Sequence, residues 1–145
     1  PLSIGLTLPA PLSFNGSMAQ QLAYYHSPVL VEAIMRTLTP VEQQIFNSNN
    51  TMYAYNIMFA PVEFIQKSYL PWMMEKINAL RMVLGSGFKP DKSFFEPREG
   101  KRTDEWYQNR IYAFAMERYT TLFFLTNNFG QQLANIKLLE DGQKV

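Results

Sequence analysis

The chain of 145 residues has no cysteine and a single histidine, His26. The absence of cysteine excludes disulfides, thiolate metal sites and a cysteine nucleophile. Charge is scarce as well, since charged residues make up only 17% of the chain. A typical soluble domain has roughly 25%. Because a monomer needs charge to cover its surface, we expect part of this surface to be covered by partners.

Long apolar runs are also missing. No stretch of about 20 consecutive apolar residues occurs, so the sequence predicts no transmembrane helix. The N-terminal segment lacks the basic residues of a secretion signal, and Pro9 and Pro11 interrupt its apolar part. The net charge is only +1, which gives no overall field to attract nucleic acid or an acidic membrane. Peripheral contact with a membrane stays compatible with this composition.

The usual patterns of catalytic and metal-binding residues do not occur. His26 directly precedes Ser27, which we interpret as a helix cap rather than a nucleophile. There is no second histidine and no spaced acidic loop to hold a metal ion. Glu96 and Glu99 lie among basic residues that neutralise them, which is typical of a solvated loop. The sequence therefore predicts no enzyme, no cofactor, no metal site and no small-molecule substrate.

What the chain does have is an alternating N-terminal arm. Side chains at alternate positions of an extended backbone point to opposite faces. We predict an extended, uncharged arm over residues 1–26 that either folds back onto its own helices or binds a neighbour. The second alternative is favoured, because a small domain offers little room for a groove of about 40 Å. The predicted partner-binding residues of the arm are Leu2, Ile4, Leu6, Leu8, Leu12 and Phe14.

Helix punctuation follows the arm. Ser27-Pro28 and Thr39-Pro40 each place a capping residue before a first-turn proline, and Glu42 completes a capping box. Further helices are predicted at 52–59, 61–69, 71–84, 104–126 (after a Thr103 cap) and 131–139. A strand at 52–59 stays an alternative. The fold class is therefore mostly α: one compact helical domain over 27–139, of about five to six helices, with the arm and a tail at 140–145.

A charged loop is predicted at about 85–103. Around it, from 88 to 110, aromatic side chains alternate with six basic and five acidic residues. Aromatic and basic residues together can hold a single-stranded nucleic acid, but phosphate binding needs uncompensated positive charge. We therefore expect other proteins rather than nucleic acid as partners. Phe94, Phe95 and Trp106 are predicted to contact them, as are Trp72 and Met73 of the helix at 71–84.

These features predict a non-enzymatic structural or accessory subunit of a large assembly, such as an organellar membrane complex or a virion. The arm and the aromatic, Met-rich helical faces would bind neighbouring subunits. The alternative is a small stand-alone regulatory or inhibitory binding protein that uses the 85–106 loop. Its main contacts would be Arg98, Lys101, Arg102 and Trp106. Nothing in the sequence indicates secretion.

Overall fold

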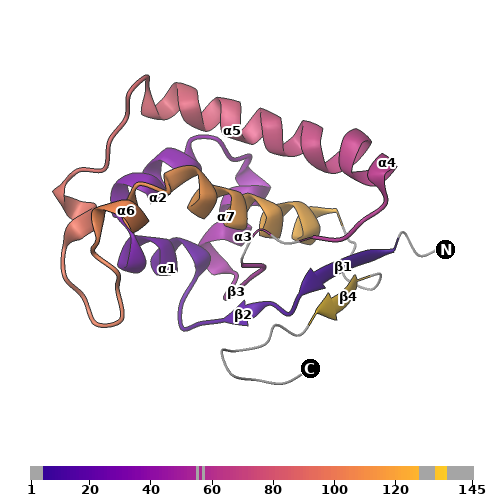
Figure 1. Ribbon diagram of the computed structural model, residues 1–145, viewed down its shortest axis with the longest axis horizontal. Helices are drawn as coiled ribbons and strands as arrows, with labels where there is room; N and C mark the ends of the chain where they lie inside the picture. Colours follow the sequence, from indigo (N-terminus) through magenta and orange to yellow (C-terminus); the bar gives the residue numbers. More distant parts are fainter. Residues whose placement is uncertain (1–4, 55, 57, 128–132, 137–145) are drawn as a thin grey trace.

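The computed structural model describes residues 5–54, 56, 58–127 and 133–136. Helices dominate, so the predicted mostly α class is confirmed. At the centre lies α7 (Ile111–Thr126), which contacts α5 (Leu70–Leu84) and α3 (Pro40–Ser48) (Figure 1). The remaining long helices, α1 (Met18–Tyr25) and α2 (Pro28–Met35), contact each other, α1 also contacting α3 and α2 contacting α5.

Two predicted helix starts are confirmed by their caps. The Ser27 hydroxyl accepts a hydrogen bond from the backbone N–H of Val29 at 3.1 Å, directly before α2. At the start of α3, the Thr39 hydroxyl accepts from the N–H of Glu42, whose carboxylate accepts from the N–H of Thr39 at 2.8 Å. These bonds satisfy donors that the first turn of a helix leaves unpaired.

The N-terminal segment is not extended throughout. Residues 18–25 form α1, so the predicted arm boundary at residue 26 is wrong. Ser17 and Gln20 make a capping box at the start of this helix, with bonds of 2.9 and 3.1 Å. A serine followed three residues later by glutamine is a helix-start signal in the sequence itself. The extended part is reduced to β1 (Leu6–Pro9) and β2 (Leu12–Ser13).

The described part of the arm lies against its own domain. β1 pairs in parallel with β4 (Leu133–Ile136), and Thr7 exchanges backbone hydrogen bonds of 2.8 and 2.9 Å with Phe59. Leu6 and Leu8 are buried in a second apolar cluster with two phenylalanines of α7. For residues 6–9, the interpretation in which the arm leaves the domain is therefore wrong. Main-chain bonds to two segments add to the stabilisation that apolar burial alone provides.

The helices predicted at 52–59 and 131–139 are wrong for the described residues, and the strand alternative for 52–59 holds only at Met52 and at Phe59, which forms an isolated bridge with Thr7. At 52–59 the described residues contain no helix, and β3 (Thr51–Met52) pairs antiparallel with β2. At 131–139 the described residues form β4, and the others lie outside the described part of the chain, like the tail at 140–145. Both segments form backbone hydrogen bonds to distant residues of the arm, which helical periodicity does not reveal.

The helices predicted to start separately at Pro61 and Pro71 form one continuous segment. It consists of α4 (Val62–Phe64), a π-helical stretch over Ile65–Tyr69, and α5. In the π-helical stretch the N–H of Leu70 donates to the carbonyl of Ile65. An inserted residue of this kind changes which side chains of the following helix face the core. Met73 is buried, whereas Met74 lies exposed.

The helix predicted from 104 to 126 is divided in two. Its cap is Asp104 rather than Thr103: the carboxylate accepts from the N–H of Tyr107 at 3.1 Å. The short helix α6 (Glu105–Gln108) follows this cap and ends at Gln108. The long helix α7 begins after Arg110, whose ψ of 43° is not helical. Between α5 and α6 runs the predicted charged loop, which contains a 3₁₀ turn at Lys92–Phe95.

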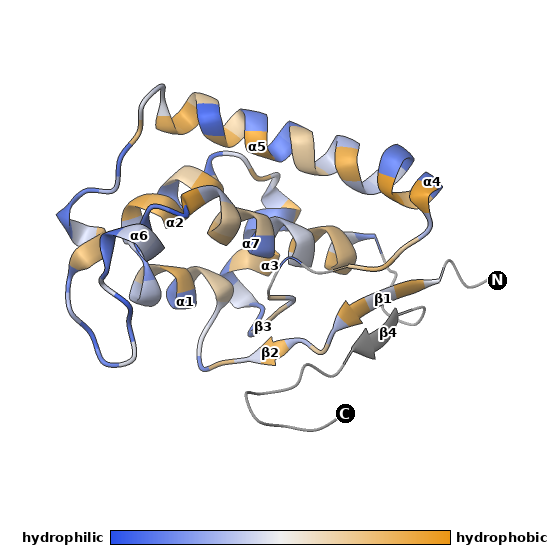
Figure 2. Cartoon of the chain, in the orientation of Figure 1, coloured by the Kyte–Doolittle hydropathy of each residue, from blue (hydrophilic) through white to orange (hydrophobic). Residues whose placement is uncertain are grey.

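Apolar side chains of the helices form the main core. Figure 2 shows apolar and polar residues alternating along α5, as expected of a helix with one buried side. The largest fully buried apolar side chains of this core are Met18, Leu22, Leu30, Ile34, Phe46, Leu80, Phe94, Tyr119 and Leu122.

Candidate functional site

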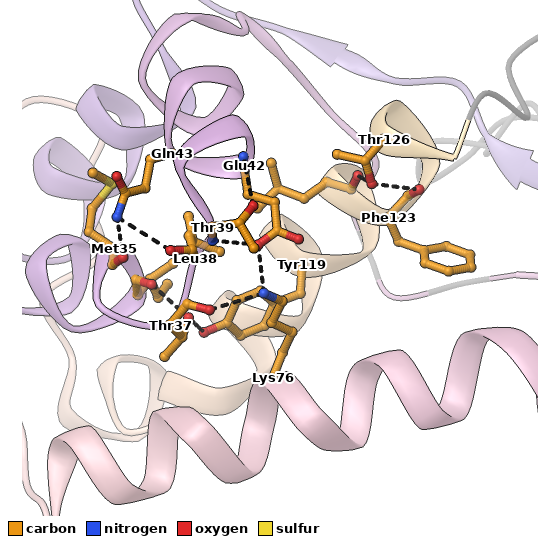
Figure 3. A network of polar contacts seen from close by, with 12 residues as sticks. Met35, Thr37, Leu38, Thr39, Glu42, Gln43, Lys76, Tyr119, Phe123 and Thr126 are labelled. Carbon is orange, nitrogen blue, oxygen red and sulfur yellow. Dashed lines mark hydrogen bonds and ion pairs between the residues drawn. The ribbon is translucent and has the colours of Figure 1, made fainter.

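Two clusters of polar side chains are buried in this helical core. The first, here the ion-pair cluster, consists of Thr37, Thr39, Glu42, Lys76 and Tyr119 (Figure 3). It joins the turn between α2 and α3 to α5 and α7. The ammonium group of Lys76 lies 2.6 Å from a carboxylate oxygen of Glu42, and both side chains are over 90% buried. An ion pair at this depth is stable only when hydrogen bonds satisfy it well.

The ion-pair cluster meets that condition. The Lys76 ammonium also donates to the carbonyl of Thr37 at 3.0 Å and lies 4.8 Å from the ring centre of Trp72. The Thr37 hydroxyl donates to the carbonyl of Ile34 and accepts from the hydroxyl of Tyr119, both at 2.6 Å. Burial raises the pKa of Tyr119 to about 12, so its hydroxyl stays protonated. We interpret this cluster as structural.

The second cluster borders a cavity of about 340 Å³, here the His–Arg cavity. Its wall is formed by residues of β2, β3, α1, the end of the charged loop, α6 and α7. The lining residues are Leu12, Gln21, Tyr25, His26, Met52, Ala54, Gly100, Arg102, Tyr107, Glu117 and Arg118. Gly100 adopts a φ of 77°, which favours glycine, and a Cβ there would lie 3.8 Å from the ring of Tyr25.

His26 ends α1 and is held from two sides. Its ring stacks on Phe114 of α7, with ring centres 3.8 Å apart. Its Nδ1 lies 3.0 Å from Oε1 of the buried Gln108. Burial lowers the pKa of His26 to about 3, and the neighbouring cations Arg118 and Lys101 act in the same direction, against the hydrogen bond to Gln108. The imidazole is therefore neutral at physiological pH.

Arg118 of α7 is only 1% exposed. Its guanidinium donates to the carbonyl of Phe114 at 3.0 Å and to the side-chain oxygen of Gln21, and its Nη1 lies 3.8 Å from the Glu117 carboxylate. The Nε of Arg118 is buried and has no hydrogen-bond partner among the described residues. Burial lowers the pKa of Arg118 to about 10, although Glu117 acts against the shift. Unlike the ammonium group of Lys76, the guanidinium group of Arg118 therefore has an N–H that makes no hydrogen bond to a described residue.

Next to the cavity, α6 and the residues that flank it carry what we name the Arg–aromatic surface: Arg102, Trp106, Tyr107 and Arg110, of which Arg102 and Tyr107 also line the cavity. Trp106 is 69% exposed, and its ring lies 5.8 Å from the guanidinium of Arg102 and 5.5 Å from that of Arg110. Arg102 is also 4.3 Å from the ring of Tyr107. Two hydrogen bonds of 3.0 and 3.1 Å tie Arg102 to Asp104. Cation–π contacts of this kind hold exposed side chains in place.

The loop that leads into this surface is fixed by long-range hydrogen bonds. The hydroxyl of Tyr24 donates to the carbonyl of Glu99 at 2.8 Å. The ammonium of Lys101 donates to the carbonyls of His26 and Ser93 at 3.1 and 3.3 Å. Burial lowers the pKa of Lys101. Lys101, predicted to contact a partner in the alternative function, instead ties the loop to its own domain.

A third feature is an exposed apolar side along α4 and α5, here the α4–α5 side. Val62, Leu70, Met74 and Met82 are large, apolar and exposed, Met82 to 85%. Charged residues lie between them, including the exposed pair of Glu63 and Lys67. In Figure 1, α4 and α6 lie at opposite ends of the long axis, whereas α5 runs back along the molecule from α4, so only the α4 end of this side is far from the Arg–aromatic surface.

The predicted partner-binding residues fall into different environments. Leu12 and Trp106 are exposed, whereas Leu6, Leu8, Met73 and Phe94 are buried in the chain's own core, which leaves them unavailable in this conformation. Phe14, Trp72 and Phe95 are half-buried against that core. Leu2 and Ile4 lie outside the described residues. The structure does not bring the members of this set together on one surface.

Sequence reasoning missed the polar residues of the cavity. Arg118 stands at a core position of its helix, in the series Ile111, Ala115, Arg118 and Leu122. A charged residue inside an apolar stripe is a signal that could have marked it. Gln108 and Gln21 carry no comparable signal, because glutamine on a helix is usually exposed.

The described part of the chain contains no cluster of three metal-ligating side chains and no helix with the length and apolar character of a membrane span. Comparisons with known proteins match this chain to no family model, no curated protein and no solved structure.

Proposed function

We propose that the chain is a non-enzymatic subunit of a multiprotein assembly and that the Arg–aromatic surface makes its main contact. The observation that carries this proposal is the position of Trp106, exposed between two guanidinium groups. Tryptophan, tyrosine and arginine are the residues that most often dominate the binding energy of protein interfaces. Here they form one surface.

The support beneath this surface adds to the argument. The bonds of Tyr24, Lys101 and Gln108 hold the backbone on both sides of Arg102. A surface that is already ordered loses less conformational entropy on binding. The charges are also nearly balanced, because Asp104 pairs with Arg102, and this favours a protein partner over a nucleic acid.

The α4–α5 side supports an assembly rather than a single partner. It is apolar and exposed, and its α4 end lies at the opposite end of the molecule from α6, so one neighbour on Trp106 would leave that part uncovered. A membrane-bound organellar complex or a virion would surround the chain with several neighbours in this way. The second candidate is a stand-alone regulatory or inhibitory binding protein, which would use the Arg–aromatic surface alone.

Site-specific photo-crosslinking in cells that express the chain tests both candidates. A crosslinking amino acid is placed at Trp106, at Met74 of the α4–α5 side, or at Gln44, an exposed control position on α3. Crosslinks from 106 and 74 to two different proteins are expected for a subunit of an assembly. A crosslink from 106 alone would favour the stand-alone protein. Crosslinks no stronger at 106 than at 44 would contradict the proposal.

Once a partner is identified, its affinity provides a quantitative prediction. Trp106→Ala should weaken binding about 30-fold, the effect of losing about 2 kcal/mol at a central aromatic contact. The matched control is Glu32→Ala on α2, a largely solvated position outside the surface, which should leave the affinity unchanged. Equal Kd values for both variants, measured by calorimetry, would place the interface elsewhere.

A further inference from the structure

The His–Arg cavity contains hydrogen-bonding groups that the fold itself does not use. Its volume of about 340 Å³ is in the range of pockets that hold small molecules. The groups that matter are His26, Arg118 and Gln21, with aromatic walls from Tyr25 and Tyr107. Their donor and acceptor roles follow from the bonds that they already make.

The orientation of Gln108 determines the protonation of His26. The Gln108 amide nitrogen donates to the carbonyls of Tyr25 and Arg102, at 3.1 and 2.6 Å. Its Oε1, an acceptor, must therefore face Nδ1 of His26, and this nitrogen must carry the hydrogen. In a neutral imidazole the other nitrogen, Nε2, then has a free lone pair. No described residue donates to it, and His26 lines the cavity, so this nitrogen is the group of His26 that is left to accept a hydrogen bond from a bound molecule.

Donors come from the opposite group of residues. The Gln21 oxygen is occupied by the Arg118 guanidinium, which leaves the Gln21 amide N–H₂ as a donor, whereas the unpartnered Nε–H of Arg118 is closed off from the cavity and becomes a donor only when the side chain moves. A bound molecule thus needs an acceptor for Arg118 or Gln21 and a donor for His26. Leaving a buried group such as the Arg118 Nε–H unpaired costs about 1–3 kcal/mol, so a molecule that pairs it gains affinity.

The charges around the cavity are compensated. Glu117 lies beside Arg118, and Asp104 is bonded to Arg102. A carboxylate ligand would bring no donor for His26, and an amidinium ligand would bring no acceptor for Arg118. A neutral amide, with N–H and C=O side by side, satisfies both, and its planar form suits aromatic walls.

From this arrangement we propose that the His–Arg cavity binds a small neutral molecule with a planar carboxamide group. The amide N–H donates to Nε2 of His26, and the amide oxygen accepts from Arg118 or Gln21. An aromatic or other flat apolar part of the molecule lies near Tyr25, Tyr107 and Met52. The cavity shares Arg102 and Tyr107 with the Arg–aromatic surface, but His26, Arg118 and Gln21, which would bind the amide, are not part of that surface, so the two proposals can fail separately.

Three isosteric probes test the proposal: benzamide, benzoate and benzamidine. Each is titrated into the full chain labelled with ¹⁵N, and the ring nitrogens of the single histidine are followed by NMR. Benzamide is expected to bind with a Kd of about 1 mM or below, and the other two at least about tenfold more weakly. The unprotonated Nε2 signal should shift toward the protonated range as benzamide is added.

His26→Phe is the matched variant, because it keeps a ring stacked on Phe114 and removes the acceptor. It should bind benzamide about tenfold more weakly, while its affinity for toluene, an apolar probe, stays unchanged. The wild-type histidine signal supplies a readout that does not depend on how this variant folds. Preferred binding of benzoate, equal binding of all probes, or an unmoved Nε2 signal at the solubility limit of benzamide would each overturn the proposal.

Discussion

The ion-pair cluster and the His–Arg cavity each contain buried polar side chains and a buried cation, Lys76 in one and Arg118 in the other, yet they differ in how far these groups are paired. In the first, Lys76 has a carboxylate, a carbonyl and an aromatic ring around it. In the second, Arg118 keeps an unpartnered Nε and His26 a free lone pair. The fold therefore uses one cluster to join its helices and leaves groups of the other available for a ligand.

Breaking the ion-pair cluster should have the largest effect on stability. Lys76→Met removes the cation and leaves the Glu42 carboxylate buried without its main partner. We expect a loss of about 3–5 kcal/mol in the free energy of unfolding, measured by urea denaturation. Combining it with Glu42→Gln should recover part of this loss, because no uncompensated charge then remains.

The control for this prediction is an exposed ion pair. Glu32 and Arg36 lie 2.8 Å apart on α2 with both side chains largely in solvent. Glu32→Gln should change stability by no more than about 0.5 kcal/mol. If Lys76→Met were as mild as Glu32→Gln, the ion-pair cluster would not hold the helices together.

The second prediction concerns the pH dependence of stability that His26 contributes in the His–Arg cavity. The pKa of His26 is about 3 in the folded chain and near its ordinary 6.5 in the unfolded chain. Between these values the unfolded state binds more protons, so this group lowers stability as the pH falls below about 6.5. The slope is about 1.4 kcal/mol per pH unit, and above pH 6.5 the contribution is flat.

The variant His26→Gln separates the pH dependence of stability that is due to His26 from that of the carboxylates. These include Asp104, whose pKa is lowered chiefly by its hydrogen bond from Arg102. The cations Arg118 and Lys101, which act on His26, and the carboxylate Glu117 beside Arg118 are unchanged in the variant. Subtracting the two pH profiles between pH 4.5 and 8 should leave the His26 slope alone. A difference that is flat over this range would mean that His26 titrates normally.

A smaller loss of stability is expected when single tyrosine hydroxyls are removed, and it should differ between the two clusters. Tyr119→Phe removes a hydroxyl that bonds to Thr37 at 2.6 Å and should cost about 1 kcal/mol. Tyr107→Phe, at the cavity wall, removes a hydroxyl with no hydrogen bond to a described residue and should be close to neutral. Thermal unfolding followed by circular dichroism would show the difference, and a larger loss at Tyr107 would reverse the comparison.

The sequence predicted those parts of the fold that depend on neighbouring residues, such as the starts of helices. The caps at Ser27 and Thr39 were sufficient to place α2 and α3. The extended backbone of β1 and β2 was predicted, but β4 and the pairing of the strands were missed, because β1 and β4 stand over 120 residues apart and their pairing depends on contacts that no local pattern encodes. The same holds for the cavity, since His26 reaches Gln108 only after α1 and α6 have come together.

The burial of single residues shows a second limit. Lys76 and Arg118 stand at core positions of apolar helices, so their burial could be read from periodicity. Whether a buried cation is paired depends on the turn between α2 and α3 in one case and on Gln21 in the other. Pairing is therefore a property of the tertiary structure, and it separates the two clusters.

The most direct test of this contrast is to remove each cation in turn, comparing Arg118→Met with Lys76→Met in the same urea titration. The lowered pKa of Arg118 means that folding disfavours its charged form, so Arg118→Met should be within about 1 kcal/mol of the wild type or more stable. Lys76→Met should lose several times more. An equal loss for both variants, or a larger loss for Arg118→Met, would show that the cavity is as structural as the ion-pair cluster.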